Sequence, residues 1–261
     1  MTRLTNQIAS RFAELPGVIA VVEAGSHTAG SADANSDIDL YVYAPSEPAL
    51  SERTAIASSF SNGANGRRME IGNRFWEPGD EWLHHETGVH LDVMYRSPAW
   101  LKDQLERVLV RHEASVGYST CVWWNVLHSR ALFDRDGWYT GSQAAARVTY
   151  PEPLQSAIVA KNQPLLRENL SSYRHQISLA LERGDKISVA HRTAAFLASY
   201  FDILFAMNGT PHPGEKRLLD YAVRLCPRRP ARLEELVTEL LGKSSLRALD
   251  ELCDQLDFSL A

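Results

Sequence analysis

The sequence predicts an α+β fold. An N-terminal α/β domain, with a mixed sheet and flanking helices, is expected over about Met1–Thr140, and an all-helical domain over about Tyr150–Ala261. Short runs rich in β-branched and aromatic residues are confined almost entirely to the first half. The second half instead repeats apolar residues at helical spacing. The 261 residues, 44% hydrophobic and 23% charged, form an ordinary globular composition with room for two domains.

Helix and strand patterns alternate in the first half. Leu4, Ile8 and Phe12 lie on one face of a predicted helix over Leu4–Leu15, which Pro16-Gly17 ends. Ser97-Pro98 is a typical helix start. The predicted strands are Val18–Val22, Ile38–Tyr43, Arg68–Phe75, Val89–Tyr95 and Ala131–Phe133. The further predicted helices are Ala49–Phe60, Trp100–His112 and Val116–His128, with Ser61–Gly66 a loop and Trp76–Gly88 a polar link.

The second half contains almost no strand pattern. Its longest apolar stretch ends at Asn208-Gly209, a plausible helix C-terminus, and Pro227–Pro230 forms a turn. The predicted helices are Pro153–Leu170, Ser172–Arg183, Ile187–Met207, Glu215–Leu225 and Arg232–Leu256.

Charge, hydropathy and cysteine content exclude several classes of protein. No apolar run is long enough to span a membrane, and the N-terminus lacks the order of a signal peptide. The net charge of -5 disfavours binding to extended nucleic acid but does not exclude a nucleotide. Three widely spaced cysteines indicate buried free thiols and a reducing cytoplasm. The oligomeric state is left open.

An acidic pair opens the second predicted strand. Side chains alternate across a strand, so Asp37 and Asp39 share one face while Ile38 and Leu40 face the core. Two such close carboxylates repel each other unless a divalent cation lies between them. Oxygen ligands of this kind suit Mg²⁺, which also binds the phosphate oxygens of a substrate. The pair therefore predicts a magnesium site.

A glycine turn precedes this pair. Gly25-Ser26 follows the first predicted strand, and ten residues separate it from Asp37. Glycine lets a phosphate approach the backbone, amide N–H groups at such a turn bind anions, and the Ser26 hydroxyl adds a donor. A phosphate site beside a metal-binding acidic pair implies phosphoryl or nucleotidyl transfer.

A third carboxylate is expected from a neighbouring strand. Asp92 interrupts the apolar run Leu91–Tyr95 and needs a partner or a metal if it is buried. It is either the third metal ligand or the general base for an incoming hydroxyl, and Glu70 is a rival for its place.

The spacing of Gly25-Ser26 and Asp37-Ile38-Asp39-Leu40 resembles the signature of the polymerase-β-type nucleotidyltransferase superfamily over roughly the first hundred residues. Asp92 matches the third acidic position of that superfamily. The α/β-then-helical plan resembles aminoglycoside nucleotidyltransferases. The segments Trp76–Trp82 and Asn208–Arg217 are similar to a less characterised branch that carries a domain of unknown function.

This resemblance implies an enzyme that moves a nucleoside monophosphate, by default AMP, from ATP or another NTP to an acceptor hydroxyl. Two Mg²⁺ ions assist, and diphosphate leaves. The acceptor is a small molecule or a protein, and the helical domain closes the active-site cleft. The alternatives left open are a non-catalytic nucleotide-binding regulatory module and an antitoxin-like partner protein on the same fold.

Further candidates complete the predicted site. Ser36 joins the glycine turn as a nucleotide-binding residue, and Lys216, at a predicted helix start, adds positive charge for the triphosphate. Glu77 and Asp80 are expected near the acceptor. The predicted set is thus Asp37, Asp39 and Asp92 for catalysis and metal binding, Gly25, Ser26, Ser36 and Lys216 for the nucleotide, and Glu77 and Asp80 for the acceptor.

Overall fold

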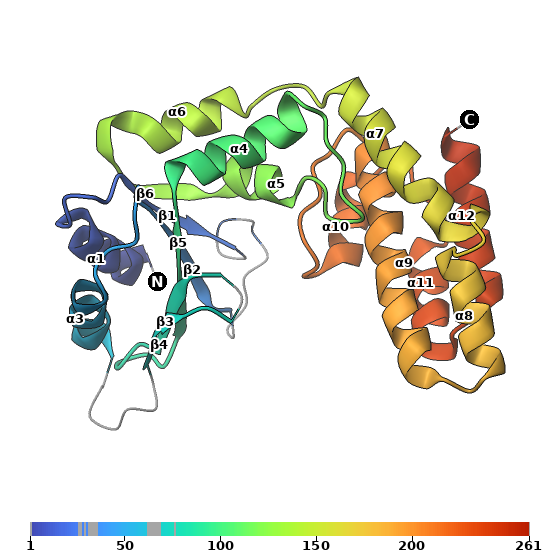
Figure 1. Ribbon diagram of the computed structural model, residues 1–261, viewed down its shortest axis with the longest axis horizontal. Coiled ribbons are helices and arrows are strands. Elements are labelled where there is room, and N and C mark those ends of the chain that lie inside the picture. The colour runs from blue at the N-terminus through green and yellow to red at the C-terminus, as the bar shows by residue number, and fades with distance from the viewer. Residues whose placement is uncertain are drawn as a thin grey trace. The chain divides into compact units, whose positions relative to one another are not determined.

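A six-stranded mixed sheet forms the centre of the N-terminal part of the chain (Figure 1). The computed structural model describes residues 2–25, 28, 30, 36–61, 69–75 and 77–260. The strand order is β3-β4-β5-β2-β1-β6; β2 and β5 are parallel, and the other neighbours are antiparallel. The strands are β1 (Ala20–Ala24), β2 (Ile38–Tyr43), β3 (Met69–Asn73), β4 (Gly79–Leu83), β5 (His90–Arg96) and β6 (Arg130–Asp134).

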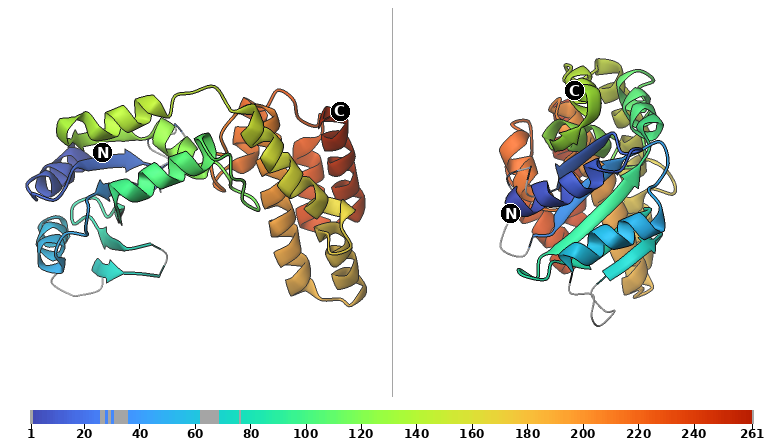
Figure 2. Two further views of the ribbon diagram at one scale, coloured as in Figure 1. Left: turned by 45° about the horizontal axis from the view of Figure 1, so that its top comes forward. Right: turned by 90° about the vertical axis from the view of Figure 1, so that its left-hand side faces the viewer.

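One face of this sheet is covered by α1 (Thr2–Ala13) and α3 (Leu50–Phe60) (Figure 2). Phe12 of α1 and Ile56 of α3 pack with strand residues in a continuous hydrophobic core. Ile38 and Leu40 of β2 belong to this core and are fully buried. Because strand side chains alternate, Asp37 and Asp39 are directed to the opposite face, as predicted.

The chain divides into two compact units, and one segment of the second unit interrupts the first unit in the sequence. The first consists of Met1–Leu105 and Asn125–Arg147, and the second of Glu106–Trp124 and Val148–Ala261. The helices α4 (Pro98–Leu109) and α5 (Cys121–His128) each cross a boundary, while a 3₁₀ turn (Arg135–Gly137) and α6 (Trp138–Ala145) end the first unit. The sequence predicts one boundary, at residues 140–150, and does not predict that Glu106–Trp124 belongs to the second unit.

The regular elements in the described part of Val148–Ala261 are helices. The central helix is α9, whose C-terminal half is almost entirely buried. The elements are α7 (Glu152–Gln163), a π-helical turn (Pro164–Glu168), α8 (Tyr173–Glu182), α9 (Lys186–Met207), α10 (Leu218–Leu225), α11 (Leu233–Lys243) and α12 (Leu246–Leu260). The α+β class, a mixed sheet with flanking helices followed by helices, is confirmed.

Within the second unit, the Asp202 carboxylate of α9 binds the segment Glu106–Trp124. Ser119 donates to Asp202 from its backbone N–H at 2.9 Å and from its hydroxyl at 2.6 Å. Asn162 of α7 accepts from the Gly117 N–H at 3.0 Å and donates to the Ser115 carbonyl at 3.0 Å. Asp202 is 1% exposed, and burial raises its pKa to about 6. The segment is therefore held by buried polar contacts with residues distant in sequence.

Some predicted elements were wrong. The link Trp76–Gly88 contains strand β4, and α6 was not predicted. The helix expected from Val116 begins only at Cys121, and Pro153–Leu170 changes to π-helical geometry at Pro164. The single helix Arg232–Leu256 is two helices, because Ser244 adopts a left-handed conformation with φ 51°.

Within the described part of the chain, none of the helices combines the length and the apolar character that a membrane span requires.

Candidate active site

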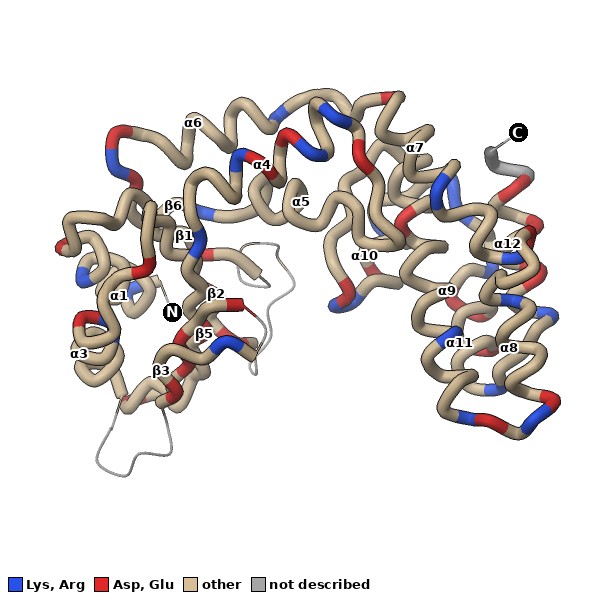
Figure 3. The backbone as a smooth tube through the Cα atoms, in the orientation of Figure 1, with Lys and Arg blue, Asp and Glu red and all other residues tan. Residues whose placement is uncertain are grey.

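Three acidic residues form a row across neighbouring strands on the face opposite the core. Asp39 of β2 is in register with Asp92 of the parallel strand β5, and Asp92 is in register with Glu81 of the antiparallel strand β4. Residues paired in this way point to the same side of a sheet. The two predicted residues Asp39 and Asp92 are thus brought together. Figure 3 shows how acidic positions gather on these strands.

The glycine turn lies directly against this row. Gly25 ends β1 with φ +71°, in the left-handed region, and Ala24 before it pairs with Asp39. A Cβ at Gly25 would lie 1.9 Å from Oδ2 of Asp39, well inside van der Waals contact. Glycine is therefore required here both by the backbone conformation and by the carboxylate beside it. The pairing of β1 with β2 therefore brings Gly25 against Asp39, although 13 residues separate them in the sequence.

His90 lies between Glu81 of the acidic row and Asp37. Nδ1 of His90 lies 3.4 Å from a carboxylate oxygen of Asp37, and its Nε2 lies 3.2 Å from Oε2 of Glu81. Asp37 is 44% exposed and Glu81 34% exposed, so both carboxylates reach solvent. Five polar side chains from β2, β4 and β5 therefore share one partly open surface: Asp37, Asp39, Glu81, His90 and Asp92.

Electrostatic repulsion is concentrated on Asp92. Its pKa is raised to about 6, first by partial burial and then by the negative charges of Asp39 and Glu81. His90 opposes this effect, and Asp37 adds to it. A carboxylate in this environment gains more from a nearby cation than an isolated one does, because a cation relieves the repulsion.

Sequence reasoning missed Glu81. The segment Trp76–Gly88 was interpreted as a polar link between two strands, so no strand was predicted at Gly79–Leu83. The usable signal was the alternation: Asp80 and Trp82 are buried on the core side, while Glu81 lies on the other face. The rival acid Glu70 is on β3, in register with Glu81, one strand farther from Asp92.

The acidic face offers oxygen ligands of the kind that Mg²⁺ prefers. No group of three or more His, Cys, Asp or Glu side chains within the described ranges is arranged so that it could hold a metal ion by itself. Mg²⁺ is usually bound by one or two carboxylates, with waters and substrate phosphates as the other ligands. The adjacent carboxylates of Asp39 and Asp92 fit that pattern, and their oxygen chemistry suits a hard cation.

The other predicted nucleotide-binding residues have different outcomes. Ser26 lies outside the described residues. Ser36 is partly exposed and directly precedes Asp37. Lys216 is exposed in the second unit, and the predicted helix start was wrong, because α10 begins only at Leu218. The phosphate-binding roles of all three stay predictions.

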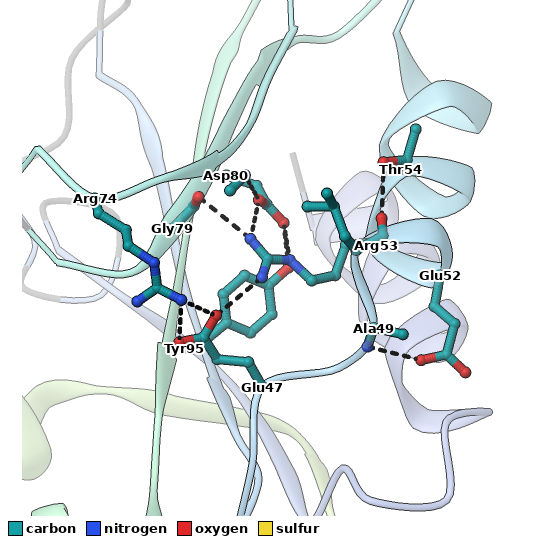
Figure 4. Close-up of polar contacts among 11 residues, drawn as sticks. Glu47, Ala49, Glu52, Arg53, Thr54, Arg74, Gly79, Asp80 and Tyr95 are labelled. Carbon is teal, nitrogen blue, oxygen red and sulfur yellow. Dashed lines mark hydrogen bonds and ion pairs between the residues drawn. The ribbon is translucent and has the colours of Figure 1, made fainter.

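Asp80 does not fit its predicted place near an acceptor. It is 1% exposed, accepts from Nε of Arg53 at 2.9 Å and from the Tyr95 hydroxyl at 2.5 Å, and also pairs with Nη2 of Arg53 (Figure 4). The Gly72 N–H donates to it at 2.7 Å. Since its oxygens are occupied in the interior on the α3 side of the sheet, Asp80 is a structural residue, and this prediction is corrected.

Glu77 is paired on the acidic face of the sheet. It accepts from Nε and Nη2 of Arg96 at 3.0 and 2.8 Å. The Arg96 guanidinium also lies 4.0 Å from the ring centre of Tyr41, which follows Asp39 on the same face of β2. Glu77 remains 44% exposed, and its contact with an acceptor stays a prediction.

Comparisons with known proteins show similarity in three dimensions to solved structures. No protein-family model matches the chain, and no curated protein matches it in sequence. The structure is similar to that of a nucleotidyltransferase-like protein from Exiguobacterium sibiricum 255-15, with a TM-score of 0.44 and 12% sequence identity. The similarity covers 99% of this chain and 73% of the other.

Proposed function

We propose that this chain is a Mg²⁺-dependent nucleotidyltransferase. It would move a nucleoside monophosphate, AMP from ATP in the simplest case, to a hydroxyl of a small molecule or a protein. The observation that carries the proposal is the in-register pair Asp39–Asp92, with Gly25 packed against the Asp39 carboxylate. Carboxylates held this close, beside a glycine that admits a phosphate, are suited to a metal-bound triphosphate.

Each residue has a distinct task in this proposal. Asp37 and Asp39 would hold Mg²⁺, and the triphosphate would lie beside the Gly25 turn. Bound Mg²⁺ would supply charge neutralisation at the phosphates and orient them for in-line displacement. Asp92 either completes the ligand set or accepts the proton of the acceptor hydroxyl, and a pKa of about 6 leaves it ionised at neutral pH for both tasks.

The reaction balances without a further reactant. The acceptor oxygen forms a bond to the α-phosphorus, the bond from that phosphorus to the bridging oxygen breaks, and diphosphate leaves. The hydroxyl proton passes to Asp92 or to solvent. The products are a phosphodiester and diphosphate.

The test is a diphosphate-release assay with each of the four NTPs, Mg²⁺ and panels of hydroxylated small molecules and proteins. Asp39→Asn should reduce turnover by more than about 100-fold, because it removes a direct ligand. Asp136→Asn is the matched control, since Asp136 is exposed and lies in the 3₁₀ turn after β6.

Titration calorimetry with Mg²⁺ and a non-hydrolysable NTP analogue separates binding from chemistry. Saturable binding with no turnover on any acceptor would favour the nucleotide-binding module instead. Turnover that Asp39→Asn leaves unchanged would refute the assignment of the site.

A further inference from the structure

A groove of about 610 Å³ lies in the second unit, far in sequence from the acidic residues. One face of α9 forms its floor, and the C-terminal ends of α8 and α11 form its walls (Figure 1 labels the three helices). At 1.5 Å per residue, its lining stretch of α9 runs roughly 16 Å. The α9 residues that line it recur at helical spacing: Lys186, Val189, Ala190, Thr193, Ala194 and Leu197.

Apolar side chains dominate this groove. Leu240 is buried at its base, whereas Leu181 and Leu241 line it and remain 39% and 59% exposed. Exposed leucines beside a long apolar depression are surface that a ligand with an apolar body would cover. The volume is within the range of small-molecule sites.

The charged side chains that line the described part of the groove are basic. Among the lining residues in the described part of the chain, the charged ones are Lys186 and Lys243, and none is acidic. The whole chain has a net charge of -5, so this rim differs in sign from the protein as a whole. Two ammonium groups without a lining acid favour an anionic ligand.

A buried hydroxyl in the lining lacks a hydrogen-bond partner. Thr193 is 5% exposed, and its Oγ1 has no partner among the described residues. A buried hydroxyl without a partner costs free energy unless an acceptor reaches it. A ligand oxygen in the groove would supply that acceptor.

We propose that this groove binds a single-chain amphiphile with an anionic head group, of which a medium-chain carboxylate is the simplest example. The apolar chain lies along α9, and Lys186 and Lys243 neutralise the head group. The apolar lining along α9 fits a chain, and the cationic rim selects the charge of the head. This inference does not depend on the proposed transferase activity.

The first experiment tests head-group charge. The full chain is titrated by calorimetry with octanoate, octan-1-ol and octylammonium, which share one chain length and differ in charge. Octanoate should bind about fivefold or more tightly than octanol, and octylammonium most weakly, in keeping with an ion pair at a partly exposed site. Equal affinity for all three, or no saturable binding of octanoate, would overturn the proposal.

The second experiment locates the site. Ala194→Trp should weaken octanoate binding about tenfold or more, because Ala194 is exposed, lines the groove, and accepts a large side chain without disturbing the core. His191→Trp is the control, since His191 is exposed on the same helix but does not line the groove. Thermal unfolding checks that both variants fold. Equal loss in both variants, or loss in neither, would contradict the site.

The third experiment separates charge from shape. The double substitution Lys186→Gln and Lys243→Gln should remove the preference for octanoate over octanol while leaving octanol binding unchanged. Lys161→Gln, an exposed lysine on α7 that does not line the groove, should retain the preference. Light scattering gives the oligomeric state: a dimer that Ala194→Trp dissociates would show that a second copy occupies the groove, and would refute an amphiphile site.

Discussion

Replacing Asp92 by asparagine should stabilise the metal-free protein while abolishing its proposed activity. Burial disfavours the ionised form of Asp92, repulsion from Asp39 and Glu81 adds to this, and its pKa rises from 3.8 to about 6 in the folded chain. Each pKa unit corresponds to about 1.4 kcal/mol, which gives an upper bound of about 3 kcal/mol. Since Asp92 is only partly buried, solvent screening reduces this to about 1–2 kcal/mol.

The pH dependence gives the sign of this effect. Between pH 4 and 6 the folded chain binds more protons at Asp92 than the unfolded chain does, so the wild-type protein loses stability as pH rises through this window. Asp92→Asn cannot ionise there. Its advantage should be full above pH 6 and should shrink as pH falls toward 4.

The assay is thermal unfolding without divalent ions at pH 8 and at pH 5. We expect the melting temperature of Asp92→Asn to exceed that of the wild type by about 2–6 °C at pH 8 and by less at pH 5. Asp136→Asn should behave as the wild type does. A variant that is no more stable at pH 8, or an advantage independent of pH, would refute the argument that burial and repulsion together disfavour ionised Asp92.

Three further predictions concern the same unit. Gly25→Ala should cost more unfolding free energy in urea than Gly88→Ala, because both have positive φ but only the first meets a carboxylate; equal costs would show that conformational strain alone matters. Glu81→Gln should lower the pKa of Asp92 below about 6 in a carboxyl NMR titration, since it removes a neighbouring negative charge, and an unchanged pKa would exclude that coupling. Asp80→Asn should destabilise the protein by about 3 kcal/mol in urea unfolding, because it removes the buried carboxylate from Arg53 and leaves the partly exposed Glu47 as its ionic partner, and a loss under 1 kcal/mol would contradict the buried pair.

The sequence was most informative where local chemistry decides the structure. Alternation along Ile38–Tyr43 placed Asp37 and Asp39 on one face, and Asp92 was selected as an acid that interrupts an apolar run. The structure adds the antiparallel pairing of β1 and β2, which brings Gly25 beside Asp39. Short-range patterns selected these candidates, and their roles stay predictions.

The features that were not predicted include a strand that depends on a contact between residues far apart in the sequence. Asp80 can occupy a buried strand position only because Arg53, 27 residues earlier, reaches it from α3. That contact has no local pattern, so strand β4 and its Glu81 were not predicted. The break at Ser244 was also missed, although Gly242 lies two residues before it in the sequence.

The contact between Ser119 and Asp202 also sets an order in time during synthesis. Ser119 leaves the ribosome 83 residues before its carboxylate partner. At typical rates of translation, this delay is roughly 4 to 17 s. The residues that complete the sheet, Asn125–Arg147, emerge well within this delay. The first unit can therefore complete its folding before α9, which binds the segment around Ser119, has been synthesised.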